Sequence, residues 1–363
     1  MVLIAVTAAV SYGCGETPNT EGEASPPAVS PAIGALEFTH GTNAAKSAAE
    51  LAASECLVAD EDTVLASDVD CILVDADGIT IDLNRFTVHG AILGMSGWND
   101  VQVTNGAVSN GAIILGARTV LSRLTVRDSD DFVVQLGFDS VISRSLFERN
   151  DVAVDLFWGN RIEVRECRFV ENSIAINIAS DNDSRVIGNR FEGNGVGVRV
   201  FDEDFVGSSG SRIVRNLFRD NDLGVYVLAQ DEANDTEISW NLFRSNSSSG
   251  ITVILGCSTD FSPLCGGRDT MIEKNLLLRN GDDPRTLTGG LPLPDDWQEY
   301  EVTPDDGLTV FAVDGAADGV TASRNVAIRN ADLGIEAEGI VDGGANRAAK
   351  NGNPLECVGV SCS

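Results

Sequence analysis

The sequence is poor in basic residues, and poorest in lysine and histidine. Among its 363 residues 25 are basic and 55 acidic, which gives a net charge of −30, and lysine occurs only at Lys46, Lys274 and Lys350. Such a surface repels phosphate, so nucleic-acid binding is excluded. Since His40 and His89 are the only histidines, a histidine acid–base pair or metal cluster is not expected. No apolar run reaches the roughly 18 residues of a membrane span.

The first residues indicate export. Residues 1–14 carry no charge, and the segment Ser11-Tyr-Gly-Cys14 resembles a bacterial lipoprotein cleavage box. Residues 15–42 hold several prolines and glutamates, a composition typical of a disordered tether. We therefore expect an extracytoplasmic protein that is either displayed on the cell surface or outer membrane or secreted. We also expect a lipid on Cys14, which would be its only contact with a membrane. An ordinary signal peptide with an unrelated cysteine is the alternative.

The cysteines agree with an oxidising compartment. Six of the eight fall into local pairs that predict disulfides, and these are Cys56–Cys71, Cys257–Cys265 and Cys357–Cys362. Cys167 lies alone within the repeat described next. We expect it to be a buried structural thiol.

The body of the chain is one sequence unit that is repeated many times. The short pattern that ends in asparagine recurs at Phe147–Asn150, Phe169–Asn172, Phe191–Asn194, Phe218–Asn221, Phe243–Asn246, Leu277–Asn280 and Ala327–Asn330. A second series lies five residues upstream and advances by the same steps, at Ser145, Cys167, Asn189, Asn216, Asn241, Asn275 and Asn325. Matched steps mean that a fixed unit is repeated and that insertions enter at another point of it.

Each asparagine is followed by a short alternating segment rich in Val and Ile, such as Val152–Leu156 and Ile174–Ile178. This alternation predicts strands, and no stretch of the repeat shows a helical stripe. Stacked parallel strands, about 4.8 Å apart, would bury the aliphatic side chains and align the asparagines into ladders. A leucine-rich repeat is the alternative, but its leucine pattern and its helix in each repeat are absent.

The chain resembles the right-handed parallel β-helix proteins of the pectate-lyase-like family. The segment Asp77–Asn84 resembles a first coil of that family, and Asn351–Cys362 resembles a C-terminal cap of its bacterial members. The resemblance covers about residues 72–362 and implies an all-β, single-domain solenoid of about ten coils, monomeric, with capped ends. We place the N-terminal cap at 43–71, with a short helix in 43–55, the β-helix at 72–344 and the C-terminal cap at 345–363. Insertions are expected at 201–211, 228–237, 256–270 and 281–307.

The outward positions of the aligned strands form a polar row. Its members are Gln135, Asp155, Asn177, Arg199, Tyr226 and Thr252, continued by Thr309 and Glu336. The insertions follow these strands at one edge, so we expect them to wall a groove that has the row as its floor. Trp158 and Trp297 are candidate sugar platforms beside Gln135, Asn177, Tyr226 and Thr252. A solvated sheet face without a ligand is the alternative.

For chemistry, the resemblance implies a Ca²⁺-dependent lyase that acts on uronate polymers. On this chain Arg199 and Asp155 would be the catalytic residues, and Asp202, Asp204, Asp181 and Asp183 the calcium ligands, since hard cations prefer carboxylate oxygens. Three observations argue against the lyase. The histidine and paired-aspartate motifs of related hydrolases are missing, arginine is always protonated, and Asp is common in ordinary turns. The first hypothesis is therefore a cell-surface protein that contacts polysaccharide, or another cell-envelope glycan, without a recognisable catalytic motif. The second hypothesis is the calcium-dependent lyase, or a related carbohydrate-active enzyme, that acts on uronate polymers. Trp240, next to a ladder asparagine, is expected to be surface packing.

Overall fold

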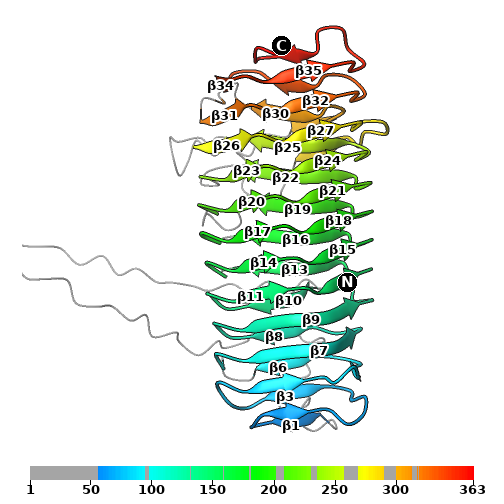
Figure 1. The fold of residues 1–363 in the computed structure, drawn as a ribbon, viewed down its shortest axis with the longest axis vertical. Helices are drawn as coiled ribbons and strands as arrows, with labels where there is room; N and C mark the ends of the chain where they lie inside the picture. The colour runs from blue at the N-terminus through cyan, green and yellow to red at the C-terminus, as the bar shows by residue number, and fades with distance from the viewer. Residues whose placement is uncertain are drawn as a thin grey trace, which may run out of the picture. The chain divides into compact units, whose positions relative to one another are not determined.

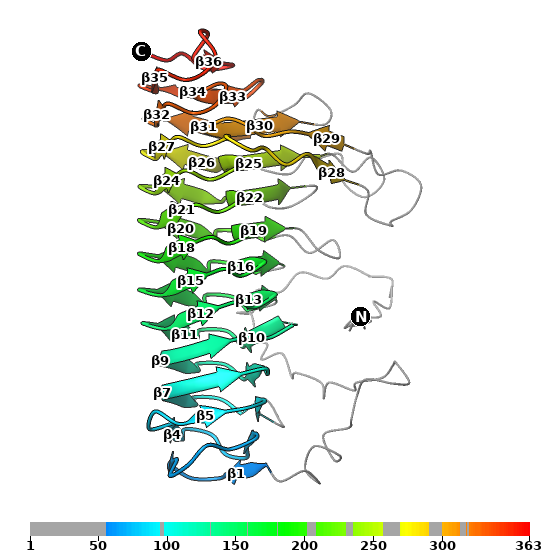
Figure 2. The ribbon, with the colours of Figure 1, turned by 90° about the vertical axis from the view of Figure 1, so that its right-hand side faces the viewer.

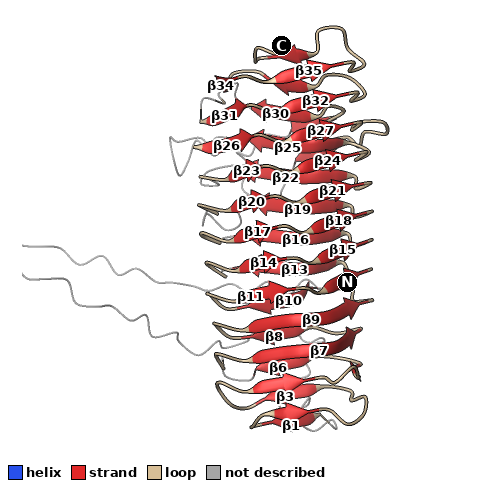
Figure 3. Ribbon diagram, viewed as in Figure 1, coloured by secondary structure: helices blue, strands red, loops and turns tan. Residues whose placement is uncertain are grey.

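The structure is a computed structural model. It describes residues 56–94, 98–130, 132–157, 159–179, 181–201, 208–229, 235–256, 269–289, 300–312, 317 and 319–363. The predicted leader, Cys14, the tether and the helix at 43–55 lie outside these residues. The described part contains strands and no helix (Figure 3), so none of its segments is a helix that could cross a membrane.

The strands coil around one axis and form two long parallel sheets (Figures 1 and 2). Within the described residues, sheet A has 13 strands. They are β1 (Leu57–Ala59), β3 (Ile72–Val74), β6 (Ile92–Gly94), β8 (Ile113–Leu115), β10 (Phe132–Leu136), β13 (Val152–Phe157), β16 (Ile174–Ala179), β19 (Val196–Phe201), β22 (Leu223–Ala229), β25 (Ser249–Leu255), β30 (Leu308–Ala312), β33 (Ile335–Ala337) and β36 (Cys357–Val358). Each strand pairs with its copy one coil away, as the repeat predicts.

Sheet B bends, and its two legs meet at a corner in every coil. The first leg holds β2 (Thr63–Val64), β4 (Thr80–Asp82), β11 (Val141–Ser143), β14 (Glu163–Arg165), β17 (Arg185–Ile187), β20 (Arg212–Val214), β23 (Glu237–Ser239), β26 (Thr270–Glu273), β31 (Val320–Ser323) and β34 (Val341–Gly344). The second leg holds β5 (Thr87–Val88), β12 (Leu146–Glu148), β15 (Arg168–Val170), β18 (Arg190–Glu192), β21 (Leu217–Arg219), β24 (Leu242–Arg244), β27 (Leu276–Leu278), β32 (Val326–Ile328) and β35 (Arg347–Ala349). The long strands β7 (Gln102–Ser109) and β9 (Val120–Arg127) run through both legs, and β28 (Leu287–Gly289) pairs antiparallel with β29 (Tyr300–Val302).

The core is a set of stacks of like side chains. Phenylalanines from five successive coils lie face to face with ring centroids 4.6–4.9 Å apart, and they are Phe147, Phe169, Phe191, Phe218 and Phe243. All five are fully buried. Identical residues stack because parallel in-register strands place each side chain directly over its copy. The repeated Phe in the sequence is therefore the inner wall of the second leg of sheet B.

Two asparagine ladders line the ends of the second leg. The first ladder is Asn189, Asn216, Asn241, Asn275, Asn325 and Asn346, and the second ladder is Asn150, Asn172, Asn194, Asn221, Asn246, Asn280, Asn330 and Asn351. In each step the backbone N–H and the side-chain amide of one asparagine donate to Oδ1 of the next, as at Asn172 and Asn194 (3.0 and 2.9 Å). The same amide also donates to a carbonyl one coil back, Phe147 O for Asn172 (3.1 Å). This satisfies the buried polar atoms of the corner, which explains the repeat of one residue type.

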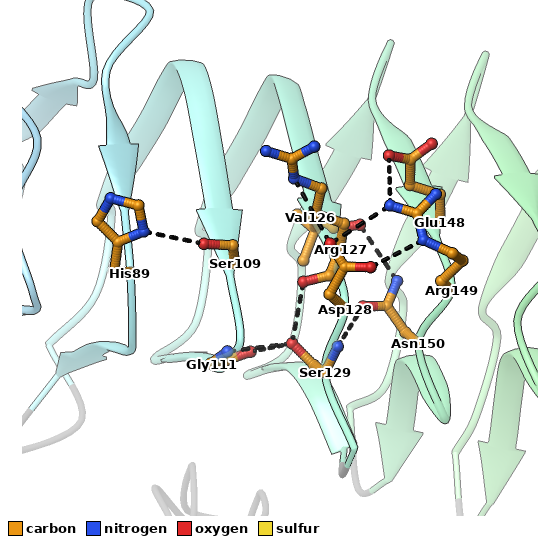
Figure 4. Close-up of polar contacts among 10 residues, drawn as sticks. All are labelled: His89, Ser109, Gly111, Val126, Arg127, Asp128, Ser129, Glu148, Arg149 and Asn150. Carbon is orange, nitrogen blue, oxygen red and sulfur yellow. Dashed lines mark hydrogen bonds and ion pairs between the residues drawn. The ribbon is translucent and has the colours of Figure 1, made fainter.

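Both ends of the second ladder are closed by other residues. At its start Ser129 donates its backbone N–H to Asn150 Oδ1 and its hydroxyl to the Gly111 carbonyl (Figure 4). At its end the amide of Asn351 donates to the carboxylate of Glu356 (2.6 Å), which also accepts the Lys350 N–H. The side-chain amides of the second ladder all donate in the same direction along the axis. The carboxylate of Glu356 accepts the last of these hydrogen bonds, and a charged acceptor makes that bond stronger.

The corners require left-handed backbone. Three positions in each regular coil have positive φ, and most hold a charged residue in place of glycine, for example Asp139 (φ 60°) and Arg161 (φ 57°). These two pair across neighbouring coils, with Arg161 Nε 2.7 Å from Asp139 Oδ1. The hydrogen bond from Arg161 lowers the pKa of Asp139. Ion pairs between successive coils thus offset part of the cost of the left-handed conformation.

Two predicted disulfides are present, Cys56–Cys71 and Cys357–Cys362, whereas Cys257 and Cys265 lie outside the described residues. Cys167 is a buried free thiol, as expected. The boundaries predicted for the caps need correction, because β1 and β2 already pair with β3 and β4 in the two sheets. The stack begins at Leu57 and not at residue 72, and at the other end β35 and β36 still belong to it. The predicted boundaries rest on the asparagine series that ends at Asn325 and Asn330, whereas the ladders continue to Asn346 and Asn351.

Candidate functional site

The polar row lies in register on sheet A. Gln135, Asp155, Asn177, Arg199, Tyr226, Thr252, Thr309 and Glu336 are direct partners from one strand to the next. Their neighbours along each strand, such as Val154 and Leu156, are core residues. Because side chains alternate between the two faces of a strand, the row stands on the outer face of sheet A. The alignment made from the sequence is confirmed.

Most of the row is not a solvated floor, however. Asp155 is 4% exposed and Asn177 2%, and the hydroxyl residues Thr252 and Thr309 are also buried. Gln135, Arg199 and Tyr226 are half-buried, and Glu336 is exposed. The alternative of a solvated sheet face does not hold for Asp155 and Asn177, whose side chains bond to their neighbours in the next coils. The row therefore consists of a buried supporting part and a more accessible contact part.

A chain of hydrogen bonds joins four members of the row. The Gln135 amide donates to Asp155 Oδ2 (2.9 Å), and the Asn177 amide donates to Asp155 Oδ1 (2.8 Å). Asn177 Oδ1 in turn accepts from Arg199 Nε (2.8 Å). The guanidinium carbon of Arg199 lies 5.5 Å from the centre of the Phe201 ring, within cation–π range. The predicted catalytic residues Arg199 and Asp155 are thus linked through Asn177, which lies in the coil between them.

The electrostatics of these four hydrogen-bonded residues favour a role in positioning side chains over a role in catalysis. Burial raises the pKa of Asp155, and the hydrogen bonds from Asn177 and Gln135 and the charge of Arg199 oppose that rise. Arg199 cannot act as a base because a guanidinium stays protonated. The arrangement can hold Gln135 and Arg199 in fixed orientations, and Arg199 can bind a carboxylate or a sugar hydroxyl.

The C-terminal end of the row carries a carboxylate group that the sequence analysis missed. Asp306 is fully buried, accepts the Leu333 N–H (2.7 Å) and accepts the Thr309 hydroxyl (3.3 Å). Burial and the neighbouring Glu336 raise the pKa of Asp306. Carboxylate oxygens of Asp305, Asp306 and Asp332 lie within 4.8 Å of one another, which is a spacing that a hard cation accepts. Asp306 lies at the end of the predicted 281–307 insertion, and nothing in the sequence marked this position as buried.

The candidate calcium ligands do not assemble within the described residues. Asp202 and Asp204 lie outside them, as do Trp158 and Trp297. Asp181 is fully buried at a corner, where its Oδ1 accepts the Asn160 N–H (2.5 Å), and burial raises its pKa to about 7. Asp183 is an exposed corner residue with positive φ. Asp181 therefore serves the backbone of its corner, in the way that serine and asparagine do at equivalent positions.

Comparison with known proteins identifies the fold. Residues 110–263 match the family described as "Right handed beta helix region". A GH87 α-1,3-glucanase catalytic domain, solved with tetrasaccharides, is similar at TM-score 0.56 and 15% identity, over 76% of this chain and 53% of the glucanase, so the chain spans about half of that domain. The periplasmic alginate epimerase AlgG is similar at TM-score 0.55 and 13% identity, over 81% of this chain and 77% of the epimerase.

The A-module of the Azotobacter vinelandii mannuronan C-5 epimerase AlgE4 is similar at TM-score 0.51 and 16% identity, over 85% of this chain and 88% of the module. No curated protein sequence matches the chain. At these identities the likeness shows the fold, and it agrees with the stacked parallel strands and the ladders. The chain is a right-handed parallel β-helix protein with the pectate-lyase-like fold.

Proposed function

We propose that this is an exported β-helix protein that contacts polysaccharide through the polar row and carries no catalytic pair there. The observation that carries the proposal is the division of the row into two parts. The buried Asp155 and Asn177 bond to Gln135 and Arg199, which are more accessible, as is Tyr226. An amide, a guanidinium and a phenol fixed along one line can bond sugar hydroxyls and carboxylates without first losing side-chain freedom.

The structural neighbours support a carbohydrate ligand. By their names, one is a glucanase solved with tetrasaccharides and two are epimerases of alginate or mannuronan. A β-helix offers such polymers a rigid sheet with one side chain per coil, at intervals of roughly 4.8 Å. Arg199 is our candidate for the central contact, with Gln135 on one side and Tyr226 on the other.

Binding to a panel of glycans tests this proposal. The protein would be run through gels that contain a neutral α-glucan, alginate or polygalacturonate, each with Ca²⁺ and with chelator, and the medium assayed for unsaturated uronate products. We expect retardation by at least one glycan and no product. The variants Arg199→Gln and Tyr226→Phe should weaken the retardation, whereas Leu355→Ala, an exposed residue far along the chain, should not. A protein that no glycan retards contradicts the proposal, and unsaturated product in Ca²⁺ would establish the lyase in its place.

Export and lipid attachment at Cys14 belong to the same proposal. Their support is the pair of disulfides, because such bonds persist in oxidising compartments. Expression in a bacterial host with labelled fatty acid would show label on the wild type and none on Cys14→Ser. Equal labelling of both proteins would remove the lipid anchor from the proposal.

A further inference from the structure

The corner between the two legs of sheet B presents an aromatic residue among cations. In four successive coils the corner residues are Arg215, Trp240, Lys274 and Arg324, which we call the corner strip. Successive members lie next to each other, since Arg215 N–H donates to Ser239 O, Trp240 N–H to Glu273 O and Lys274 N–H to Ser323 O. Their side chains therefore rise along the axis at one residue per coil.

Trp240 is unusual at this position. Its φ is 58°, a conformation that is costly for a bulky residue. The indole is not packed away, because 57% of the residue is exposed. Lys274 Nζ lies 5.1 Å from the ring centre. Other coils place Gly188 or Ala345 at the same corner with a similar φ, so the fold does not require an aromatic residue there. Trp240 therefore presents an exposed indole at a corner where other coils place small or charged residues.

An apolar row borders the corner strip on the outer face of the second leg. Leu217, Leu242, Leu276 and Val326 are partners from coil to coil, and none of them is buried. Leu276 is 37% exposed. In earlier coils the same corner is an open hollow, lined by Arg123, Arg144 and Arg168 among others. The corner strip and the apolar row therefore lie side by side on the surface and run along the axis.

The corner strip carries basic residues on a protein that has an excess of acidic ones. The chain carries −30 overall, and Arg199 is the one basic residue in the described strands of sheet A. In the corner strip Arg215 is exposed and has no ion-pair partner among the described residues, while Lys274 and Arg324 share Glu273. The exposed guanidinium of Arg215 can therefore attract an anionic group to this corner.

We propose that the corner strip is a second glycan site, which takes a polysaccharide that carries carboxylates. The apolar face of a sugar ring would lie on Trp240 beside Leu242 and Leu276. Arg215 and Lys274, one coil to either side, would bind the carboxylates of that sugar or of its neighbours. This site goes beyond the proposed function, since it lies on sheet B and shares no residue with the polar row.

Binding of oligogalacturonate, measured by titration calorimetry at low and high salt, tests the site, with neutral maltooligosaccharide as the matched probe. Trp240→Ala and Arg215→Gln should each weaken oligogalacturonate binding about tenfold. Added salt should weaken it too, because exposed charges are screened. Ala345 shows that this corner accepts alanine, so Trp240→Ala should fold, and Leu355→Ala is the control for loss of an exposed apolar residue.

The outcomes separate this site from the polar row. If Arg199→Gln weakens binding while Trp240→Ala binds oligogalacturonate like the wild type, the corner strip is not a site and the proposed function stands. If Trp240→Ala alone weakens binding, the corner strip is the site and the row is not. A wild type that does not bind oligogalacturonate overturns the corner strip, whatever neutral glycans do.

Discussion

The second ladder and the polar row are both columns of polar side chains that rise along the same stack, yet they differ in composition. The ladder repeats asparagine from Asn150 to Asn351, and each member makes the same bonds to the next coil. The row changes residue in almost every coil, and its bonds run in no constant direction, since Asp155 accepts from both sides. A column that must satisfy backbone groups needs one residue type. The polar row does not have to satisfy backbone groups in this way, so its residue types can vary from coil to coil. A binding surface requires such variation.

The largest effect should follow from breaking the ladder in its middle. Asn194→Leu removes the side-chain acceptor of the Asn172 backbone N–H and amide, and it removes the amide that donates to the Phe169 carbonyl and to Asn221 Oδ1. Since each buried polar group left unsatisfied costs about 1–3 kcal/mol, we expect a loss of about 3–5 kcal/mol in the free energy of unfolding, measured by urea denaturation. Asn182→Leu, at an exposed asparagine pair, is the matched control. Equal losses in both variants would contradict the role assigned to the ladder.

Asp306, which accepts a hydrogen bond from Thr309 of the polar row, should make the free energy of unfolding depend on pH. Its pKa is raised to about 8 from 3.8, so the folded state holds a proton that the unfolded state releases. That contribution is fully present below about pH 4 and is lost as pH rises through about 8. Asp306→Asn keeps an acceptor for Leu333 N–H and should flatten this decline, measured as Tm from pH 4 to 9. An unchanged slope in the variant would show that other groups cause it.

Within the row, Asn177→Ala tests the support given to Arg199. The variant removes one bond to Asp155 and one to Arg199, so we expect a loss of about 1–3 kcal/mol, less than for Asn194→Leu. The pKa of Asp155 should rise further, since the hydrogen bond from Asn177 lowers it. Carbon-13 NMR titration of the Asp155 carboxyl measures that shift, with Tyr226→Phe as the control. A pKa that stays in place would contradict the bonded chain.

The sequence predicts the ladders and the alignment of the row because stacked coils repeat the same residue types. The steps between these repeats can be counted in the sequence. Asn189 and Asn216 are recognisable as copies, and so are Asp155 and Asn177 as neighbours in register. Burial of the row could not be predicted, since period-two alternation says which face a side chain is on and nothing about what covers that face. The burial of Asp306 escaped for the same reason. The coil at Leu57 escaped because it is short and holds no ladder asparagine, and the last coil escaped because Asn346 and Asn351 are not preceded by the phenylalanine or leucine pattern of most other coils.

The smallest effect concerns Cys167, where the column of the first ladder lacks its asparagine. Cys167 donates its backbone N–H to Asn189 Oδ1 (2.9 Å), and its thiol is 3.3 Å from the Arg165 carbonyl. Burial raises the pKa of this thiol to about 12, so it stays protonated and unreactive in the folded protein.

Cys167→Asn would extend the first ladder by one coil. Asn189 donates to Val164 O and Asn216 Oδ1, so by the same pattern an asparagine at 167 would donate to Ile142 O and Asn189 Oδ1. Two added bonds at a buried site should raise the free energy of unfolding by about 1 kcal/mol. Cys167→Ala removes the thiol without adding a bond and should lower it. If the asparagine variant is no more stable than the alanine variant, the ladder depends on its context as much as on asparagine itself, and the contrast with the row weakens accordingly.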